Sequence, residues 1–100
     1  MNTELLNKIT ASGYDVVADY DELESVGVVI QDYVDELNQL KADIEGLSEE
    51  ERLNLPAGNL PCLIACIVVY MLCRANNNGG LGGALQCQLE YQSCQNNCAS

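Results

Sequence analysis

The sequence contains no histidine, tryptophan or phenylalanine, and only four of its 100 residues are lysine or arginine. Histidine is the usual general base and the commonest metal ligand, so its absence removes the ordinary centre of acid–base chemistry. No nucleophile–base arrangement and no phosphate-binding loop is evident. Nucleic-acid phosphates need basic partners, and the formal net charge here is −11. The sequence therefore predicts no enzyme, no cofactor and no nucleic-acid partner.

A secretory signal peptide is also missing from the start of the chain. The stretch MNTELLNKIT has no basic segment followed by a long apolar one. The longest apolar stretch, Leu60 to Cys73, has 14 residues, whereas a helix that crosses a bilayer needs about 20. Export of any product would therefore need another route than a signal peptide.

Charge and cysteine divide the chain near residue 58. Residues 1–58 hold 14 of the 15 acidic residues and no cysteine. Residues 59–100 hold all six cysteines, and their only charged side chains are Arg74 and Glu90. This division predicts an acidic helical leader peptide over 1–58 and a cysteine-rich helical-hairpin core peptide over 59–100.

The six cysteines follow the palindromic spacing C-x3-C-x6-C-x13-C-x6-C-x3-C. Facing residues of an antiparallel helical hairpin have position numbers with a constant sum, and pairing the cysteines outward from the centre gives 160 each time. Helical periodicity also puts the three cysteines of each arm on one face. The spacing therefore predicts an all-α fold whose hairpin carries three nested disulfides, Cys62–Cys98, Cys66–Cys94 and Cys73–Cys87.

Metal binding and thioether crosslinks are the alternative uses of these cysteines. Zinc sites normally show C-x-x-C pairs or histidine, and the chain has neither, so we predict no metal site. Lanthionine rings need serine or threonine acceptors, and residues 59–100 contain only Ser93 and Ser100. The composition thus favours disulfides, although spacing alone does not distinguish them from thioethers.

Residues 23–47 carry an apolar stripe with alternating spacings of three and four residues, which is typical of an amphipathic helix. Such a stripe can dock on a processing enzyme or transporter, pack on its own chain, or pair with a second copy. A short second helix is expected from Ser48, because Ser48 and Glu51 match the capping-box pattern. The stripe consists of Leu23, Val26, Ile30, Tyr33, Leu37, Leu40, Ile44 and Leu47.

Residues 47–58, LSEEERLNLPAG, resemble the double-glycine leaders of bacteriocins and other ribosomally made peptides (RiPPs). Such leaders end in two small residues and are cut by the cysteine-peptidase domain of a dedicated ABC transporter. The resemblance implies cleavage after Gly58, with Ala57 before it and Asn59 after it. The chain departs from the pattern in its Ala-Gly ending and in Arg52, which stands where leucine is usual. The resemblance assigns leader recognition to Ile44, Leu47, Ser48, Glu51, Leu53 and Leu55.

Two literal Gly-Gly pairs, 79–80 and 82–83, lie between Cys73 and Cys87 in an asparagine- and glycine-rich segment. A cut at either pair would put polar or glycine residues at the apolar docking positions. Glycine and asparagine favour turns, so we interpret both pairs as part of the hairpin loop. The second helix is then expected from about Ala84 to Asn97, and the first from Pro61 to about Ala75.

Residues 59–100 are similar to the glycocins, in which two helices with C-x6-C segments are joined by a glycine-rich loop. The chain departs from this family in its added outer pair, Cys62 and Cys98. Its loop also lacks the cysteine, serine or threonine that would carry a sugar. The resemblance implies an exported antimicrobial peptide built on a stapled hairpin.

The leading hypothesis is therefore a bacteriocin-like precursor, cytoplasmic while it bears its leader and secreted as the mature peptide. Its first hairpin helix is apolar on nearly all sides, which predicts a membrane or membrane-protein target. The neutral charge of residues 59–100 favours a specific target over general attraction to anionic lipid. The expected partners are a peptidase-containing ABC transporter and a maturation enzyme that binds the leader. The alternatives are an exported structural, self-assembling or signalling peptide, and a stapled helical-hairpin protein retained at full length.

Overall fold

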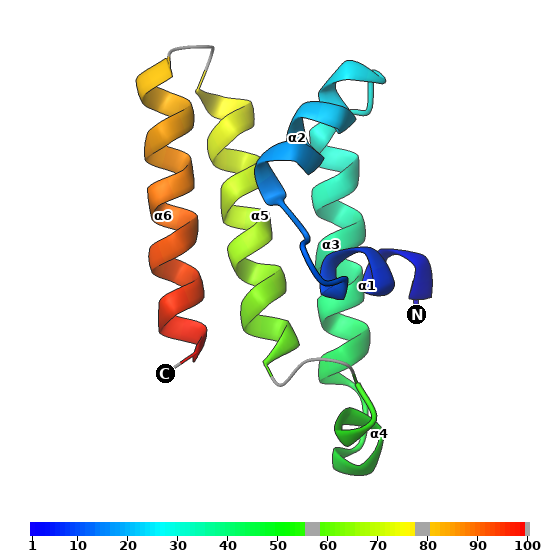
Figure 1. Ribbon diagram of the computed structural model, residues 1–100. Helices are drawn as coiled ribbons and strands as arrows, with labels where there is room; N and C mark the ends of the chain where they lie inside the picture. The colour runs from blue at the N-terminus through cyan, green and yellow to red at the C-terminus, as the bar shows by residue number, and fades with distance from the viewer. Residues whose placement is uncertain (56–58, 78–80, 100) are drawn as a thin grey trace.

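The computed structural model describes residues 1–55, 59–77 and 81–99, with only the backbone described at 81, 82 and 99. These residues form six α-helices and no strand, which confirms the all-α fold class (Figure 1). The helices are α1 (Thr3–Thr10), α2 (Val16–Ser25), α3 (Ile30–Glu45), α4 (Glu49–Leu53), α5 (Leu60–Asn76) and α6 (Leu81–Ala99).

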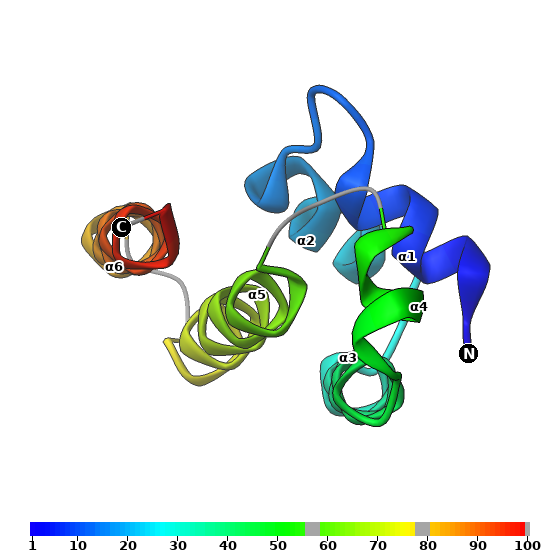
Figure 2. The ribbon, with the colours of Figure 1, turned by 90° about the horizontal axis from the view of Figure 1, so that it is seen from below.

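Three long helices, α3, α5 and α6, form an antiparallel row with α5 in the middle (Figure 1). Viewed down the axes of these three helices, α1 and α2 lie together on one side of the row (Figure 2). The short helix α4 extends beyond the end of α3. The central helix therefore contacts the predicted leader on one side and its hairpin partner on the other.

The sequence of α5 explains its central position. Leu60, Ile64, Ile67 and Met71 recur at helical spacing and are at most 1% exposed. Its cysteines lie on the opposite side of the helix, at about 100° of rotation per residue. The cysteine side faces α6, and the aliphatic side packs with α3 in a single hydrophobic core. Residues on both sides of the predicted cut therefore share one core.

The apolar stripe of residues 23–47 does not form one helix, contrary to our prediction. Helix α2 ends at Ser25 and α3 begins at Ile30. Gly27 has a φ of +80°, and the Val28 amide donates to the Leu23 carbonyl at 3.0 Å, as in a Schellman C-cap. Val26 is consequently 69% exposed rather than buried. Within α3 the stripe holds, because Tyr33, Leu37, Leu40 and Ile44 all lie in the core.

The local predictions around residue 50 are confirmed. The Glu51 amide donates to Ser48 Oγ at 3.3 Å, and the Ser48 amide donates to Glu51 Oε1 at 3.2 Å. This capping box begins α4. Pro61 lies in the first turn of α5, where the missing amide hydrogen costs no helical hydrogen bond.

Candidate functional site

Three disulfides join α5 to α6 in the nested order predicted from the cysteine spacing: Cys62–Cys98, Cys66–Cys94 and Cys73–Cys87. The Cα atoms of every pair are 5.7 Å apart, so the two helices stay in constant register along the hairpin. Cys66 and Cys87 are fully buried. All the crosslinks therefore lie within residues 59–100.

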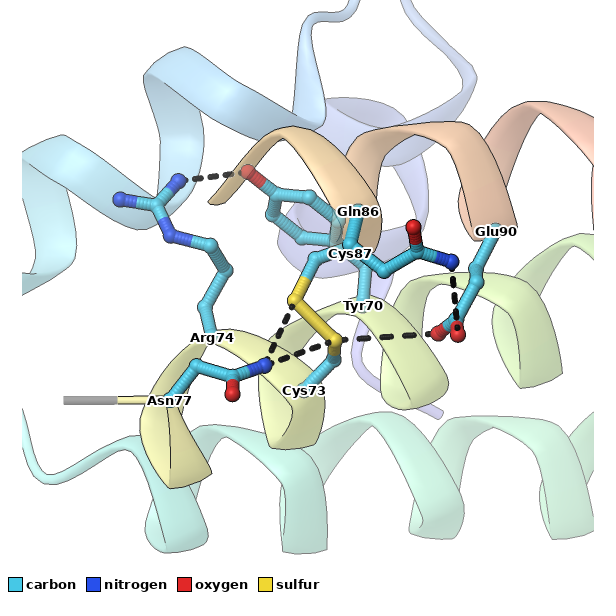
Figure 3. The surroundings of a disulfide bond; sticks show 7 residues. All are labelled: Tyr70, Cys73, Arg74, Asn77, Gln86, Cys87 and Glu90. Carbon is cyan, nitrogen blue, oxygen red and sulfur yellow. Dashed lines mark hydrogen bonds between the residues drawn. A yellow bond between two sulfur atoms is a disulfide. The ribbon is translucent and has the colours of Figure 1, made fainter. Parts of the chain in front are cut away.

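The innermost disulfide closes the neck of the hairpin (Figure 3). The Asn77 side-chain amide donates to the sulfurs of Cys87 and Cys73, at 3.4 and 3.5 Å. On the other side, a Glu90 carboxylate oxygen lies 3.7 Å from the Cys73 sulfur. The helix ends thus meet through both a covalent bond and a polar cluster.

Helix α6 begins earlier than predicted, and this corrects our interpretation of one glycine pair. Gly82 and Gly83 belong to α6 rather than to the loop. A Cβ added at Gly83 would lie 3.2 Å from the Asn77 Cβ, so glycine permits the close approach of the two helix ends. The other pair, 79–80, lies outside the described residues.

A cluster around Arg74 joins the hairpin to residues 1–58, and we call it the Arg74 contact. The guanidinium donates to Asp21 Oδ1 at 2.9 Å and to the Tyr70 hydroxyl at 2.6 Å. It also lies 4.4 Å from the centre of the Tyr20 ring. Arg74 is the only basic residue of 59–100. Its partners Asp21 and Tyr20 both lie in α2, so the contact joins α5 to α2.

The tyrosine rings continue this contact across the molecule. Tyr70 packs edge-on against Tyr20 and Tyr91, with ring centres 6.3 and 5.8 Å away. Burial raises the pKa of Tyr70, although its hydrogen bond with Arg74 opposes that shift. Burial likewise raises the pKa values of Tyr20 and Tyr91. These rings remain neutral hydrogen-bonding groups near neutral pH.

Residues 1–58 have a polar core of their own around Asp19, which is only 7% exposed. Lys8 Nζ pairs with one carboxylate oxygen at 2.6 Å. The hydroxyls of Tyr14 and Tyr33 donate to the other oxygen at 2.7 and 2.9 Å. Burial and these contacts raise the pKa of both tyrosines. This cluster fixes α1, α2 and α3 together, and no motif in the sequence pointed to it.

The residues assigned to leader recognition do not share one surface. Ile44 is fully buried, whereas Leu53 in α4 is 84% exposed. Ser48 and Glu51 are exposed, while Leu47 and Leu55 are half-buried. Helix α4 has no buried residue, so it is the accessible part of this set.

The predicted cleavage site is described only on its product side. Ala57 and Gly58 lie outside the described residues. Asn59 is exposed and precedes α5 as its N-cap. Helix α5 therefore begins within two residues of the predicted cut.

A cavity of about 350 Å³ separates the loop before α2 from α6. Residues 13–17 line one side of it, and the hairpin contributes Gln88, Tyr91, Gln92 and Gln95 on the other. Its walls are mainly polar and come from both sides of the predicted cut.

Among the side chains of the hairpin that the structure describes, three large apolar ones remain exposed, namely Val69, Leu85 and Leu89. No described helix is both long and apolar enough to cross a membrane. Among the described residues, the sulfurs of Cys62, Cys66 and Cys98 form a group compact enough to hold a metal ion.

Comparison with known proteins gives no assignment: no protein-family model, no curated protein and no solved structure matches the chain.

Proposed function

We propose that the chain is the precursor of an exported bacteriocin-like antimicrobial peptide comprising residues 59–100. An ABC transporter with a cysteine-peptidase domain would cut it after Gly58. One observation carries the proposal. The hairpin has all its crosslinks within 59–100, whereas the apolar side of α5 is covered by α3 from the other side of the predicted cut.

In this arrangement, the crosslinks of the hairpin lie within residues 59–100, whereas the helix that covers its apolar surface lies within residues 1–58. Cleavage breaks none of the crosslinks of the hairpin, because no disulfide joins residues 1–58 to residues 59–100. Loss of the leader would expose Leu60, Ile64, Ile67 and Met71, each now at most 1% exposed. Exposing one such side chain costs about 1.5–3 kcal/mol. The released peptide would recover that free energy by inserting this surface into a membrane or a membrane protein.

Charge supports a specific target in this proposal. Residues 59–100 have no net charge, so electrostatic attraction to anionic lipid would be weak. Arg74 would lose Asp21 with the leader and would stand as the only cationic side chain of the released peptide, beside the exposed apolar surface. A partner that offers an acidic or aromatic group next to an apolar stripe would replace the leader.

The burial of Ile44 bears on how the leader would be recognised. Helix α4 presents Leu53, Ser48 and Glu51 to solvent, so a peptidase can engage these residues first. Contact with Ile44 requires α3 to leave α5. We propose that the exporter binds α4 and then displaces α3, coupling recognition to exposure of the hairpin.

The shared core favours a second candidate, a stapled helical protein retained at full length. The Arg74 contact and the α3–α5 packing would then be permanent features of the protein. A third candidate, an exported self-assembling or signalling peptide, would use the same uncovered side of α5 to bind further copies.

The first experiment is the intact mass of the chain secreted by the producing cell, before and after reduction. We expect the mass of residues 59–100, which gains six hydrogen atoms when three disulfides are reduced. A secreted or cellular protein found only at full length would overturn the leader hypothesis and support the second candidate. A Gly58→Val variant serves as the control, because a narrow protease cleft that requires a small residue would reject it.

The purified peptide then separates the first candidate from the third. Growth inhibition of competing bacteria by the oxidised peptide, and not by the full chain, would support an antimicrobial. Concentration-dependent oligomers without growth inhibition would support a self-assembling peptide.

A further inference from the structure

Four cysteines gather at the open end of the hairpin, where α5 begins and α6 ends. Cys62 and Cys66 are one helical turn apart on α5, and Cys94 and Cys98 are one turn apart on α6. The sulfurs of Cys62, Cys66 and Cys98 lie within 4.8 Å of one another. The fourth, from Cys94, is bonded to Cys66. We call these four residues the end cluster.

In the end cluster, sulfur atoms that belong to different disulfides also lie close together. The Cys66 sulfur lies 3.5 Å from the Cys98 sulfur, although these two are not bonded to each other. Four thiolates around Zn²⁺, with Zn–S bonds of about 2.3 Å, are separated by about 3.8 Å at tetrahedral angles. The spacing between the disulfides is thus close to an edge of such a tetrahedron.

We propose that the end cluster, when its four cysteines are reduced, binds one Zn²⁺ ion through four thiolates. The inference is independent of the proposed function. It concerns the dithiol form of the chain, since a sulfur in a disulfide has no thiolate to offer. Binding replaces four S–H bonds by four Zn–S bonds and releases four protons.

The surroundings of the end cluster suit this ion. Cys66 is fully buried, and Cys62 and Cys98 are half-buried, so the ion would be shielded from competing water. Zn²⁺ has no electronic preference of geometry and accepts the positions that two rigid helices impose. The site would carry a net charge of −2, which the partial positive charge of the first turn of α5 next to Cys62 favours and the partial negative charge at the end of α6 next to Cys98 opposes.

The lack of C-x-x-C pairs and histidine led us to predict no metal site. Two C-x3-C pairs give ligands on single helical faces, and the antiparallel hairpin brings the two pairs together. The third pair, Cys73 and Cys87, lies at the other end of the hairpin and serves as an internal control.

The test uses the full chain, reduced by a phosphine under anaerobic conditions. Each disulfide takes two electrons and two protons, and the phosphine becomes its oxide with oxygen from water. Two double variants each keep four thiols: Cys73→Ser with Cys87→Ser, and Cys62→Ser with Cys98→Ser. Zinc is measured after gel filtration, and Co²⁺ is used as a spectroscopic probe.

We expect one Zn²⁺ per chain for the wild type and for the Cys73/Cys87 variant. Both should show the thiolate-to-cobalt charge-transfer band and the intense ligand-field bands of tetrahedral Co²⁺. The Cys62/Cys98 variant should bind zinc at least tenfold more weakly and lose these bands. Equal zinc affinity in the two variants, or no binding by the wild type, would overturn the proposal.

A thermal measurement removes the ambiguity of a variant that fails to fold. Helix content of each reduced chain is followed by circular dichroism with and without Zn²⁺. Zinc should raise the melting temperature of the wild type and of the Cys73/Cys87 variant, because a ligand that binds only the folded state stabilises it. An equal rise in the Cys62/Cys98 variant would contradict the assignment to the end cluster.

Discussion

Among single residues, Arg74 makes the most specific connection between residues 1–58 and the hairpin. It pairs with Asp21, donates to Tyr70 and stacks on Tyr20. Asp21 is 61% exposed, so the ion pair alone contributes less than about 1 kcal/mol. The half-buried guanidinium gains more from the aromatic ring and the charged hydrogen bond.

We expect Arg74→Ala to lower the free energy of unfolding of the full chain by about 1–2 kcal/mol. Urea unfolding at neutral pH measures this loss. Lys41→Ala is the matched control, because the ion pair between Lys41 and Glu45 lies within α3 and does not join two helices. The control should lose less than about 0.5 kcal/mol. Equal losses would mean that the Arg74 contact adds nothing beyond an ordinary surface pair.

Among the helices, α3 decides whether the apolar side of α5 is covered. Leu37 is fully buried in the shared core, whereas Leu53 of α4 is 84% exposed. Leu37→Ala should destabilise the full chain by about 3 kcal/mol, through lost burial and the cavity that it leaves. Leu53→Ala, the same substitution at an exposed site, should stay within about 0.5 kcal/mol. A similar small effect at both positions in urea unfolding would show that α3 is not packed on α5 in solution.

The helices also show which features could be predicted from the sequence. The cysteine spacing predicted the hairpin, its register and its three disulfides, because cysteines that must pair across two helices allow few other arrangements of those helices. The capping box at Ser48 and Glu51 and the position of Pro61 depend on neighbours in sequence, so they were predictable too.

Features that depend on tertiary context were not predictable in this way. The break at Gly27 was missed because the spacing of apolar residues continues across it, although glycine there adopts a positive φ. Gly83 was assigned to the loop because its use, the close approach of Asn77, arises only once α5 and α6 are paired. Of the alternatives for the apolar stripe, the structure shows packing within the chain. The buried Asp19 cluster and the Arg74 contact join residues far apart in sequence and left no periodic signal.

For the molecule as a whole, the buried tyrosines predict how stability depends on pH. Burial raises the pKa of all five tyrosines, Tyr14, Tyr20, Tyr33, Tyr70 and Tyr91, above the ordinary value of 10.0. Below that value all five are protonated in both states, so they add no pH dependence. Above it the unfolded chain releases protons that the folded chain retains, and stability falls with rising pH.

The expected loss is up to about 1.4 kcal/mol per pH unit for each tyrosine, beginning near pH 10. Urea unfolding of the oxidised chain between about pH 8 and about pH 11 measures it, with tyrosinate absorbance as a second signal. Tyr33→Phe should reduce the loss of unfolding free energy per pH unit by the contribution of one tyrosine. A free energy of unfolding that stays constant through this range would contradict the burial of these rings.

The shared core also predicts the behaviour of the molecule after cleavage. A site-specific protease sequence inserted after Gly58 allows the backbone to be cut in the folded protein. We expect both fragments to co-elute in gel filtration, because α3 and α5 remain packed and the Arg74 contact is intact. Leu37→Ala should promote separation. Immediate separation of the wild-type fragments would show that covalent linkage is needed to keep α5 covered.

The nested order of the disulfides has a consequence for damage by proteases. Any single backbone cut between Cys62 and Cys98 is spanned by at least one disulfide, since the outermost pair encloses the other two. Such a nick adds one water molecule and yields no free fragment until the disulfides are reduced. A cut before Cys62, by contrast, divides the chain into two molecules. The start of α5 is thus a boundary for proteolysis. A single cut on its N-terminal side releases a fragment, whereas a single cut between Cys62 and Cys98, including one in the loop, leaves one covalent molecule. Limited proteolysis with intact-mass analysis should find nicked hairpins that stay one molecule until they are reduced. Under denaturing conditions, a single cut before Cys62 should release the segment on its N-terminal side without any reduction.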